Sequence, residues 1–318
     1  MALYVGGTVN FGDNEEASPA EGDIWYDSGK FCFGTSLNFM PGVWSSGGNL
    51  ATARYNLAGA GTQTAGLCMG GSGVSAVTEE YNGTSWSAGG NLATARYALS
   101  GAGTQSAGLS MGGDVGGDVV TNITEEYNGT SWSTGGNLTT ARMQFAGAGT
   151  QSSGLCMGGM DSNWSDTNNT EEYNGTSWSA GGNLATARNL LAGAGTQSAG
   201  LCMGGTAGGW SNVTEEYDGT SWSAGGNLAT ARGALAGAGT QSAGLSMGGW
   251  NSNVTEEYDG TSWSGGGNLG TARRHLAGCG TQSAGLCMGG TTGSTSNVTE
   301  EYSALSSHED LFSASGGL

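Results

Sequence analysis

The chain has 318 residues, of which 65 are Gly and two are Pro, with eight basic and 26 acidic residues and a formal net charge of −18. Without a Gly-X-Y register this composition excludes a collagen-like chain, and ten Trp, ten Tyr and six Phe supply apolar area that a disordered chain lacks. The excess of acidic residues opposes nucleic-acid binding. The sequence contains no run of 18 apolar residues, so no membrane-spanning helix is predicted.

The first 41 residues differ from the rest of the chain. The start, MALYVGG, has neither a basic nor an apolar signal region, so no secretory signal peptide is predicted. ALYVGG and GDIWYD loosely echo the second and third strands of the repeats that follow, which leaves a partial seventh blade open. We otherwise expect residues 1–41 to form a small β-rich extension.

One phrase recurs through the remainder of the chain. TSWSAGGNLATAR at 220–232 returns unchanged at 84–96 and 176–188, and with two changes at 130–142 and 261–273. Its closing arginines are Arg54, Arg96, Arg142, Arg188, Arg232 and Arg273, which lie 42, 46, 46, 44 and 41 residues apart. Periods of 40 to 50 residues with several short strands in each unit predict a β-propeller.

Each unit contains four segments that are too short for capped helices and are bounded by Gly, Asn, Asp or Ser. Asn-Gly or Asp-Gly pairs, such as Asn82-Gly83, predict a hairpin turn between the third and fourth strands. The first segment is almost entirely Ala, Gly and Leu, as the crowded innermost strand of a propeller requires. The unit is therefore a four-stranded antiparallel blade.

The last unit ends at Tyr302 without the Trp strand that completes the others. GVWSS, which contains Trp44, stands at the other end of the repeats, so residues 42–46 are expected to complete the sixth blade and close the ring. The fold predicted is all-β, with an extension at 1–41, a six-bladed propeller at 42–302 and a C-terminal tail at 303–318. The fourth-strand tryptophans are Trp44, Trp86, Trp132, Trp178, Trp222 and Trp263.

The unit resembles the kelch repeat. It has a double Gly after the second strand, such as Gly70-Gly71, a Tyr in the third strand, a Trp in the fourth, and an Arg that opens the next unit. The resemblance covers residues 44–302 and implies that the Tyr and Trp of one unit, such as Tyr81 and Trp86, pack against the glycine pair.

Twelve of the 26 acidic residues form Glu-Glu pairs in the third strand of each unit. Consecutive strand residues point to opposite faces, so the two carboxylates of a pair cannot act together as acid and base. We expect the repeat Arg to bind one Glu of each blade in the interior, and the other Glu to face solvent.

Other chemical motifs have structural explanations. Gly-Leu-Ser-Met-Gly at 108–112 and 244–248 matches a hydrolase nucleophile motif, but no helix follows it and Cys replaces the Ser in the other units. Cysteines at one repeat position of different blades are too far apart for disulfides, so all six are expected to be free. No cofactor or metal is predicted, although an ion on the propeller axis stays open.

The turn sequence Asn/Asp-Gly-Thr-Ser-Trp resembles the Asp-box of sialidase propellers, one residue short. That resemblance implies a sialidase-like glycoside hydrolase with three converging Arg and a Tyr nucleophile. Six of the seven Arg are repeat elements, which leaves Arg274 and Tyr97 as the residues to test. A non-enzymatic protein is the preferred prediction.

Two positions differ between units: the loop between the second and third strands, and the pair after each Arg. In an up-and-down blade both lie at the same end, so the variable residues share one face. Aromatic residues with Asn and Ser are typical of recognition surfaces. The predicted ligand-binding residues are Tyr55, Tyr97, Trp164, Trp210, Trp250, Asn251, Arg274 and His275. Drift in unconstrained loops is the alternative.

The near-verbatim units, together with SPAEGDIWYDSGKF in the extension, resemble repeat proteins of marine tailed phages. The resemblance implies a multicopy virion component, a tail fibre or capsid appendage, made in the host cytoplasm. Residues 1–41 would bind other virion proteins, and the variable face would bind a host-surface glycan or protein. A purely structural virion assembly protein is the alternative.

Overall fold

The computed structural model describes residues 24–27, 30–33 and 42–304. In the N-terminal unit, β1 (Ile24–Asp27) and β2 (Lys30–Phe33) form an antiparallel hairpin. Most of the predicted docking extension at 1–41 and of the tail at 303–318 lies outside the described residues. No helix of the described chain is long and apolar enough to cross a membrane.

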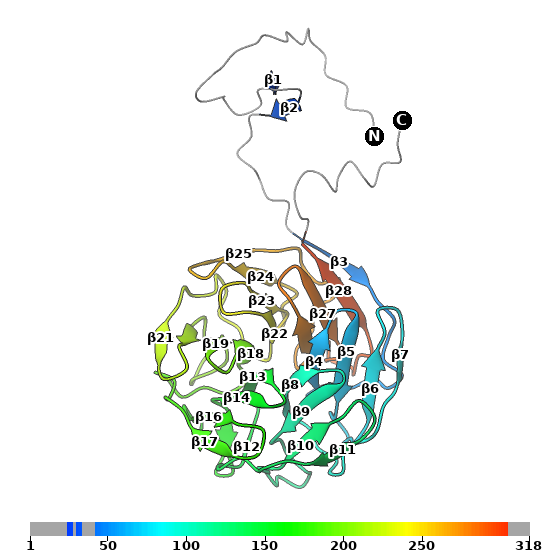
Figure 1. Ribbon diagram of the computed structural model, residues 1–318, viewed down its shortest axis with the longest axis vertical. Helices are drawn as coiled ribbons and strands as arrows, with labels where there is room; N and C mark the ends of the chain where they lie inside the picture. Colours follow the sequence, from blue (N-terminus) through cyan, green and yellow to red (C-terminus); the bar gives the residue numbers. More distant parts are fainter. Residues whose placement is uncertain (1–23, 28–29, 34–41, 305–318) are drawn as a thin grey trace. The chain divides into compact units, whose positions relative to one another are not determined.

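The described residues from 42 to 304 form six four-stranded antiparallel sheets arranged as the blades of a propeller (Figure 1). From the inner to the outer strand, the blades are β4 (Ala58–Thr62), β5 (Ala65–Met69), β6 (Thr78–Tyr81), β7 (Trp86–Ala88); β8 (Ser100–Thr104), β9 (Ala107–Met111), β10 (Thr124–Tyr127), β11 (Trp132–Thr134); β13 (Ala146–Thr150), β14 (Ser153–Met157), β16 (Thr170–Tyr173), β17 (Trp178–Ala180); β18 (Ala192–Thr196), β19 (Ala199–Met203), β20 (Thr214–Tyr217), β21 (Trp222–Ala224); β22 (Ala236–Gly239), β23 (Gly244–Met247), β24 (Thr255–Tyr258), β25 (Trp263–Gly265); and β26 (Ala277–Gly280), β27 (Ala284–Met288), β28 (Thr299–Ser303), β3 (Val43–Ser46). The predicted fold is therefore confirmed.

The sixth blade joins the two ends of the repeat region. β3 pairs antiparallel with β28, with Trp44 opposite Tyr302, and the blue and red ribbons lie side by side in Figure 1. This is the place that the sequence predicts for Trp44. Because the outer strand comes from the other end of the chain, the ring closes with hydrogen bonds and not with a covalent link.

The inner strands lie so close that only small side chains fit between them. A Cβ added to Gly101 would lie 3.3 Å from the Ala58 Cβ and 2.8 Å from the Gly59 carbonyl oxygen of the preceding blade. The same Ala-to-Gly approach recurs around the ring, with Ser100 in place of Ala at one interface. This packing explains the Ala-Gly composition of the first strand.

Side chains of the outer strands join each blade to the one before it. Trp86 packs on Tyr81 with 4.9 Å between ring centroids, and its indole N–H donates to Thr299 of the sixth blade at 2.9 Å. The Gln63 amide donates to the Tyr302 carbonyl at 2.7 Å. The same bonds occur at all six interfaces, so each unit carries the contacts that hold its neighbour.

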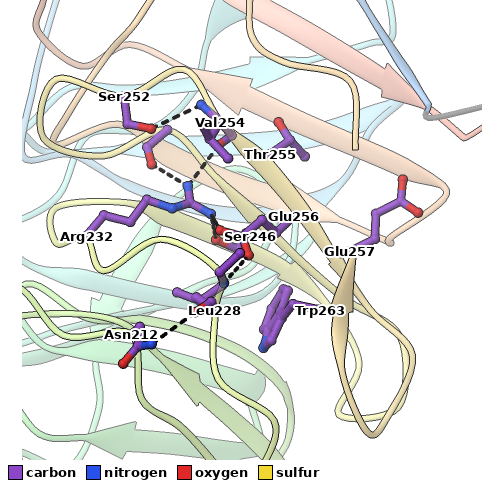
Figure 2. Close-up of polar contacts among 12 residues, drawn as sticks. Asn212, Leu228, Arg232, Ser246, Ser252, Val254, Thr255, Glu256, Glu257 and Trp263 are labelled. Atoms are coloured by element: carbon purple, nitrogen blue, oxygen red, sulfur yellow. Dashed lines mark hydrogen bonds and ion pairs between the residues drawn. The ribbon is translucent and has the colours of Figure 1, made fainter. Parts of the chain in front are cut away.

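Each repeat Arg is buried and anchors the loop of its blade. The guanidinium of Arg232 donates to the carbonyls of Gly248 (2.6 Å) and Val254 (2.8 Å), to the Ser246 hydroxyl and to the Glu256 carboxylate, both at 2.8 Å (Figure 2). Arg232 and Glu256 expose 2% and 3% of their side chains. One Glu of each pair thus binds the Arg, as the sequence predicts.

The prediction for the second Glu is wrong. Glu257 points away from Arg232 in Figure 2, but it accepts a hydrogen bond from the Tyr302 hydroxyl of the next blade. The second Glu of every pair is half-buried and bonded to a Tyr in this way. The two faces of a strand inside a propeller contact different neighbouring blades, so the two Glu of a pair meet different partners. The Glu-Glu dipeptide therefore binds within its blade and between blades.

The glycine pair does not lie against Tyr and Trp, contrary to what the kelch resemblance implies. A Cβ on Gly70 would meet Leu99 and the Arg96 carbonyl of the next blade, and one on Gly71 would meet Arg54 and Leu57. Both glycines have positive φ, at 65° and 118°, which side chains disfavour. The glycine pair therefore allows a backbone turn next to the buried Arg54.

In five of the six blades the position shared by Cys and Ser supplies an acceptor to the Arg, whereas Arg142 of the third blade bonds the Glu171 carboxylate and two carbonyls. Arg54 donates to the Cys68 sulfur at 3.1 Å, where Arg232 donates to the Ser246 hydroxyl. Burial raises the pKa of Cys68 to about 11, so the thiol stays protonated at neutral pH. The five cysteines of residues 42–304 are free, and Cys32 lies where no side chain is described.

We expect Arg188→Met to destabilise the propeller by about 3–5 kcal/mol, because Glu215, 2.7 Å from the guanidinium, would stay buried without a counter-charge. Urea unfolding followed by Trp fluorescence measures the change. Arg274→Met, which removes a guanidinium outside the six buried pairs, is the matched control and should leave the midpoint nearly unchanged. An Arg188→Met protein that unfolds at the wild-type urea midpoint would contradict a stabilising role of the ion pair.

We also expect stability to fall at high pH. Burial, followed by the hydrogen bond to a Glu, raises the pKa of Tyr81, Tyr173, Tyr217 and Tyr258 to about 12. Since the pKa of unfolded Tyr is about 10, the contribution of these Tyr residues to stability is complete below about pH 10 and is lost as the pH rises towards about 12. Urea midpoints across this range test it, and Tyr173→Phe should flatten the slope. A midpoint independent of pH there would count against it.

Candidate binding face

The pair after each Arg and the loop between the second and third strands lie together, as the sequence predicts. Tyr97 forms a backbone bridge with Asp114, and Arg274 forms one with Thr291. In the third blade the contact extends to a ladder of β12 (Arg142–Met143) and β15 (Met160–Asp161). We call this end of the propeller, with loops 72–77, 114–123, 160–169, 206–213, 250–254 and 291–298, the variable face.

Six backbone hydrogen bonds form a closed circle at the centre of this face. The second residue after each Arg has a φ between 53° and 57° and donates its N–H to the equivalent carbonyl of the preceding blade, at 2.8–2.9 Å. Its members are Asn56, Ala98, Gln144, Leu190, Ala234 and His275. We call this circle the mouth ring. It joins all six blades a second time, close to the axis.

The mouth ring opens into a central cavity of about 130 Å³. Below the ring its wall consists of Leu, Phe, Ala, Ser and Gly from the starts of the inner strands, without a charged side chain. Within the described part of the chain, no three His, Cys, Asp or Glu side chains come together in a way that could hold a metal ion. The side chains of the described residues therefore provide no ligand set for an ion on the axis.

Five of the predicted ligand-binding residues form one continuous cluster, which we call the aromatic arc. The Trp210 and Trp250 rings lie 5.5 Å apart, and the Arg274 guanidinium carbon lies 4.0 Å from the centroid of Trp250. His275 meets Trp250 edge-on at 6.2 Å and reaches Tyr55 at the same distance. The arc includes Trp210 and Trp250 from the variable loops of the fourth and fifth blades. Its other members, Arg274, His275 and Tyr55, follow the repeat Arg at the start of the sixth and first blades.

The arc exists because one blade has no side chain after its Arg. Gly233 stands where other units have Tyr, Met, Asn or Arg, and a Cβ there would come within 2.7 Å of the Trp210 ring. The Trp210 ring, from the loop of the fourth blade, can therefore pack directly on the backbone of Gly233 at the start of the fifth blade. One blade further on the equivalent position holds Arg274, and its guanidinium lies over the ring of Trp250.

Arg274 supplies the charge of the arc. Burial, and then the positive charge of Arg274, lower the pKa of His275 to about 4, so the imidazole is neutral at physiological pH. Arg274 is the only basic side chain of residues 42–304 outside the six buried ion pairs. The arc thus combines exposed indole rings with one guanidinium.

Three predicted residues lie outside the arc. Trp164 is 51% exposed and pairs with no other aromatic ring of the described residues. Tyr97 is half-buried beside Asp114, and burial followed by the Asp114 charge raises its pKa. Asn251 is exposed next to Trp250, with a φ of 54°. Gly233 is not among the predicted residues, because its only signal in the sequence is the absence of a side chain in a variable pair.

No family model and no curated protein matches the sequence. Among solved structures the chain is similar to YjhT, also a propeller, with a TM-score of 0.68 over 81% of this chain and 96% of that chain. The two sequences are 13% identical, so the likeness shows the fold alone. The propeller is therefore shown, whereas the kelch and phage resemblances stay predictions.

The mouth ring can be tested by relieving its strain. A left-handed non-Gly residue costs roughly 1–2 kcal/mol, so Gln144→Gly should stabilise the propeller by up to about 1 kcal/mol, whereas Gln144→Val should destabilise it. Urea midpoints give the signs. Asn56→Gly is the control and should gain less, because Asn tolerates this conformation. Equal midpoints for Gln144→Gly and Gln144→Val would contradict a strained ring.

Proposed function

We propose that the propeller is a non-enzymatic recognition module that binds a glycan or protein of a host surface through the variable face. One observation carries the proposal. Among residues 42–304 the large exposed apolar side chains include three Trp, Trp164, Trp210 and Trp250, and all three stand in the variable loops. Exposed aromatic side chains on loops of a rigid scaffold are typical of binding surfaces.

The opposite face differs from the variable face in composition. Its turns repeat the same Thr-Gln and Gly-Thr-Ser sequences in nearly every blade, and Asn82 and its equivalents stabilise them by accepting backbone N–H groups. The two faces share one scaffold, and the exposed Trp side chains of the described residues stand on only one of them. This contrast supports binding through the variable face.

The placement of the arginines supports a non-enzymatic role over the sialidase-like alternative. A sialidase-type site needs three guanidinium groups around a substrate carboxylate, and six of the seven Arg are buried in ion pairs at 0–2% exposure. Arg274 and Tyr97 stand in the sixth and second blades. A single accessible guanidinium is sufficient for binding.

The proposed setting is a virion, in which the module would be a multicopy tail fibre or capsid appendage that is attached through residues 1–41. The near-verbatim repeats and the SPAEGDIWYDSGKF segment support this assignment through their resemblance to repeat proteins of marine tailed phages. A purely structural virion protein is the second candidate, which the uniform opposite face favours as an assembly surface.

A binding experiment on candidate host cells separates the two candidates. Fluorescently labelled protein should bind the cells, and simultaneous replacement of Trp164, Trp210 and Trp250 by Ala should reduce binding at least about tenfold, since exposed aromatic anchors dominate interfaces.

The matched control changes three exposed residues of the opposite face, Thr84, Thr130 and Thr220, to Ala and should bind as the wild type does. All three proteins should show the same thermal unfolding. Equal binding by the triple Trp variant and the wild type would refute recognition through this face, and absence of binding by the wild type would favour the structural candidate.

A further inference from the structure

One half of the variable face carries its positive charge and the other half its negative charge. Arg274 stands beside Trp250, and no acidic side chain of residues 42–304 forms an ion pair with it. The acidic residues of the variable loops all belong to the second and third blades. They are Asp114, Asp118, Asp161 and Asp166. The guanidinium of the arc is therefore free for an anionic ligand.

The contact with Trp250 prepares this guanidinium for binding. A guanidinium over an indole ring is held by the ring electrons and keeps its N–H donors for an acceptor, and a carboxylate can accept two of them at once. Since Trp250 restrains the side chain beforehand, Arg274 loses little conformational freedom when a ligand binds.

Trp210 adds an apolar plane next to this charge. Its side chain is 44% exposed, and its position over Gly233 and beside Trp250 is fixed by contact. An indole plane packs against the C–H face of a sugar ring as it does against other apolar surfaces, while the hydroxyl groups of the sugar stay in water. Plane and charge together fit a ring that has an apolar face and an anionic substituent.

The charge of the whole chain limits how many anions the ligand can carry. A protein with a net charge of −18 repels a densely charged polymer, whereas one carboxylate next to Arg274 experiences mainly the local attraction. This argument separates a glycan with scattered acidic sugars from a polysulfated chain or a nucleic acid.

We propose that Trp210, Trp250 and Arg274 form a subsite for a carboxylate-bearing sugar within a glycan of low charge density. Trp210 packs on the sugar ring, Arg274 binds the carboxylate, and Trp250 positions the guanidinium. The inference rests on the proposed recognition role of the variable face and specifies its ligand class.

The test compares two sugars that differ only in the carboxylate, methyl β-D-glucuronide and methyl β-D-glucoside. Saturation-transfer NMR and Trp fluorescence titration on the full chain should show tighter binding of the glucuronide. Arg274→Gln should remove that preference and weaken glucuronide binding at least about tenfold. The preference should also shrink as salt is added.

Two further variants test the roles of the rings. Trp210→Ala should weaken the binding of both sugars. Gly233→Val should have the same effect by displacing Trp210, while Arg274 stays in place. Trp164→Ala removes a similarly exposed Trp of another loop and should leave both affinities unchanged. Thermal unfolding of each variant shows whether the propeller is intact.

Equal affinity of the wild type for the two sugars, or an unchanged preference in Arg274→Gln, would overturn the subsite, and so would binding of neither sugar. These outcomes leave the proposed function standing if the triple Trp variant still loses cell binding. In that case equal affinity would indicate a neutral glycan, and binding of neither sugar would favour a protein ligand. If the triple variant keeps full cell binding, the proposed function itself fails.

Discussion

A buried guanidinium under every variable loop is the contact on which the rest of this molecule depends. In each blade the Arg bonds the carbonyls at the two ends of the loop. For Arg188 these are Gly204 at 2.6 Å and Val213 at 2.9 Å. The loops between such carbonyls differ from five to ten residues in length, yet the anchors are the same. Loop sequence can change because loop attachment does not.

The anchor is not explained by stability alone. Removing two charges from water costs about as much as their attraction returns, so a buried ion pair is weak evidence for a stabilising role. What the pair provides is position, since a guanidinium that bonds two carbonyls and a carboxylate at once fits one arrangement of strand and loop. The residue two positions after the Arg then enters the mouth ring, so the anchor also sets the geometry at the axis.

The sequence alone was sufficient for the architecture because each repeated residue solves the same local problem six times. Spacing, hairpin turns and the displaced Trp44 strand predict the blades and their closure, and the alternation of strand faces predicts that one Glu of each pair binds the repeat Arg, as Glu215 binds Arg188. The partner of the second Glu was missed because it lies in another blade, where single-blade arguments do not reach. The glycine pair was misplaced because the family pattern gives residue types and not their neighbours.

The binding face was predictable in position and not in composition. Strand direction places all variable residues at one end, but nothing in the spacing distinguishes Trp164, which stands apart, from Trp210 and Trp250, which meet. That difference depends on the conformation of the loops and on Gly233, whose missing side chain leaves space for Trp210.

The repeats acquire an individual binding surface only where they cease to be identical. Six equal blades would present six equal and weak sites around the axis. Here Gly233 opens space in one blade and Arg274 adds charge in the next, so that side chains of neighbouring loops meet once. Since these changes lie above the Arg anchors and outside the cores of the blades, they alter the surface without disturbing the ring. A propeller with near-verbatim repeats can therefore change its ligand by a few substitutions on one face, while every contact that closes it is preserved.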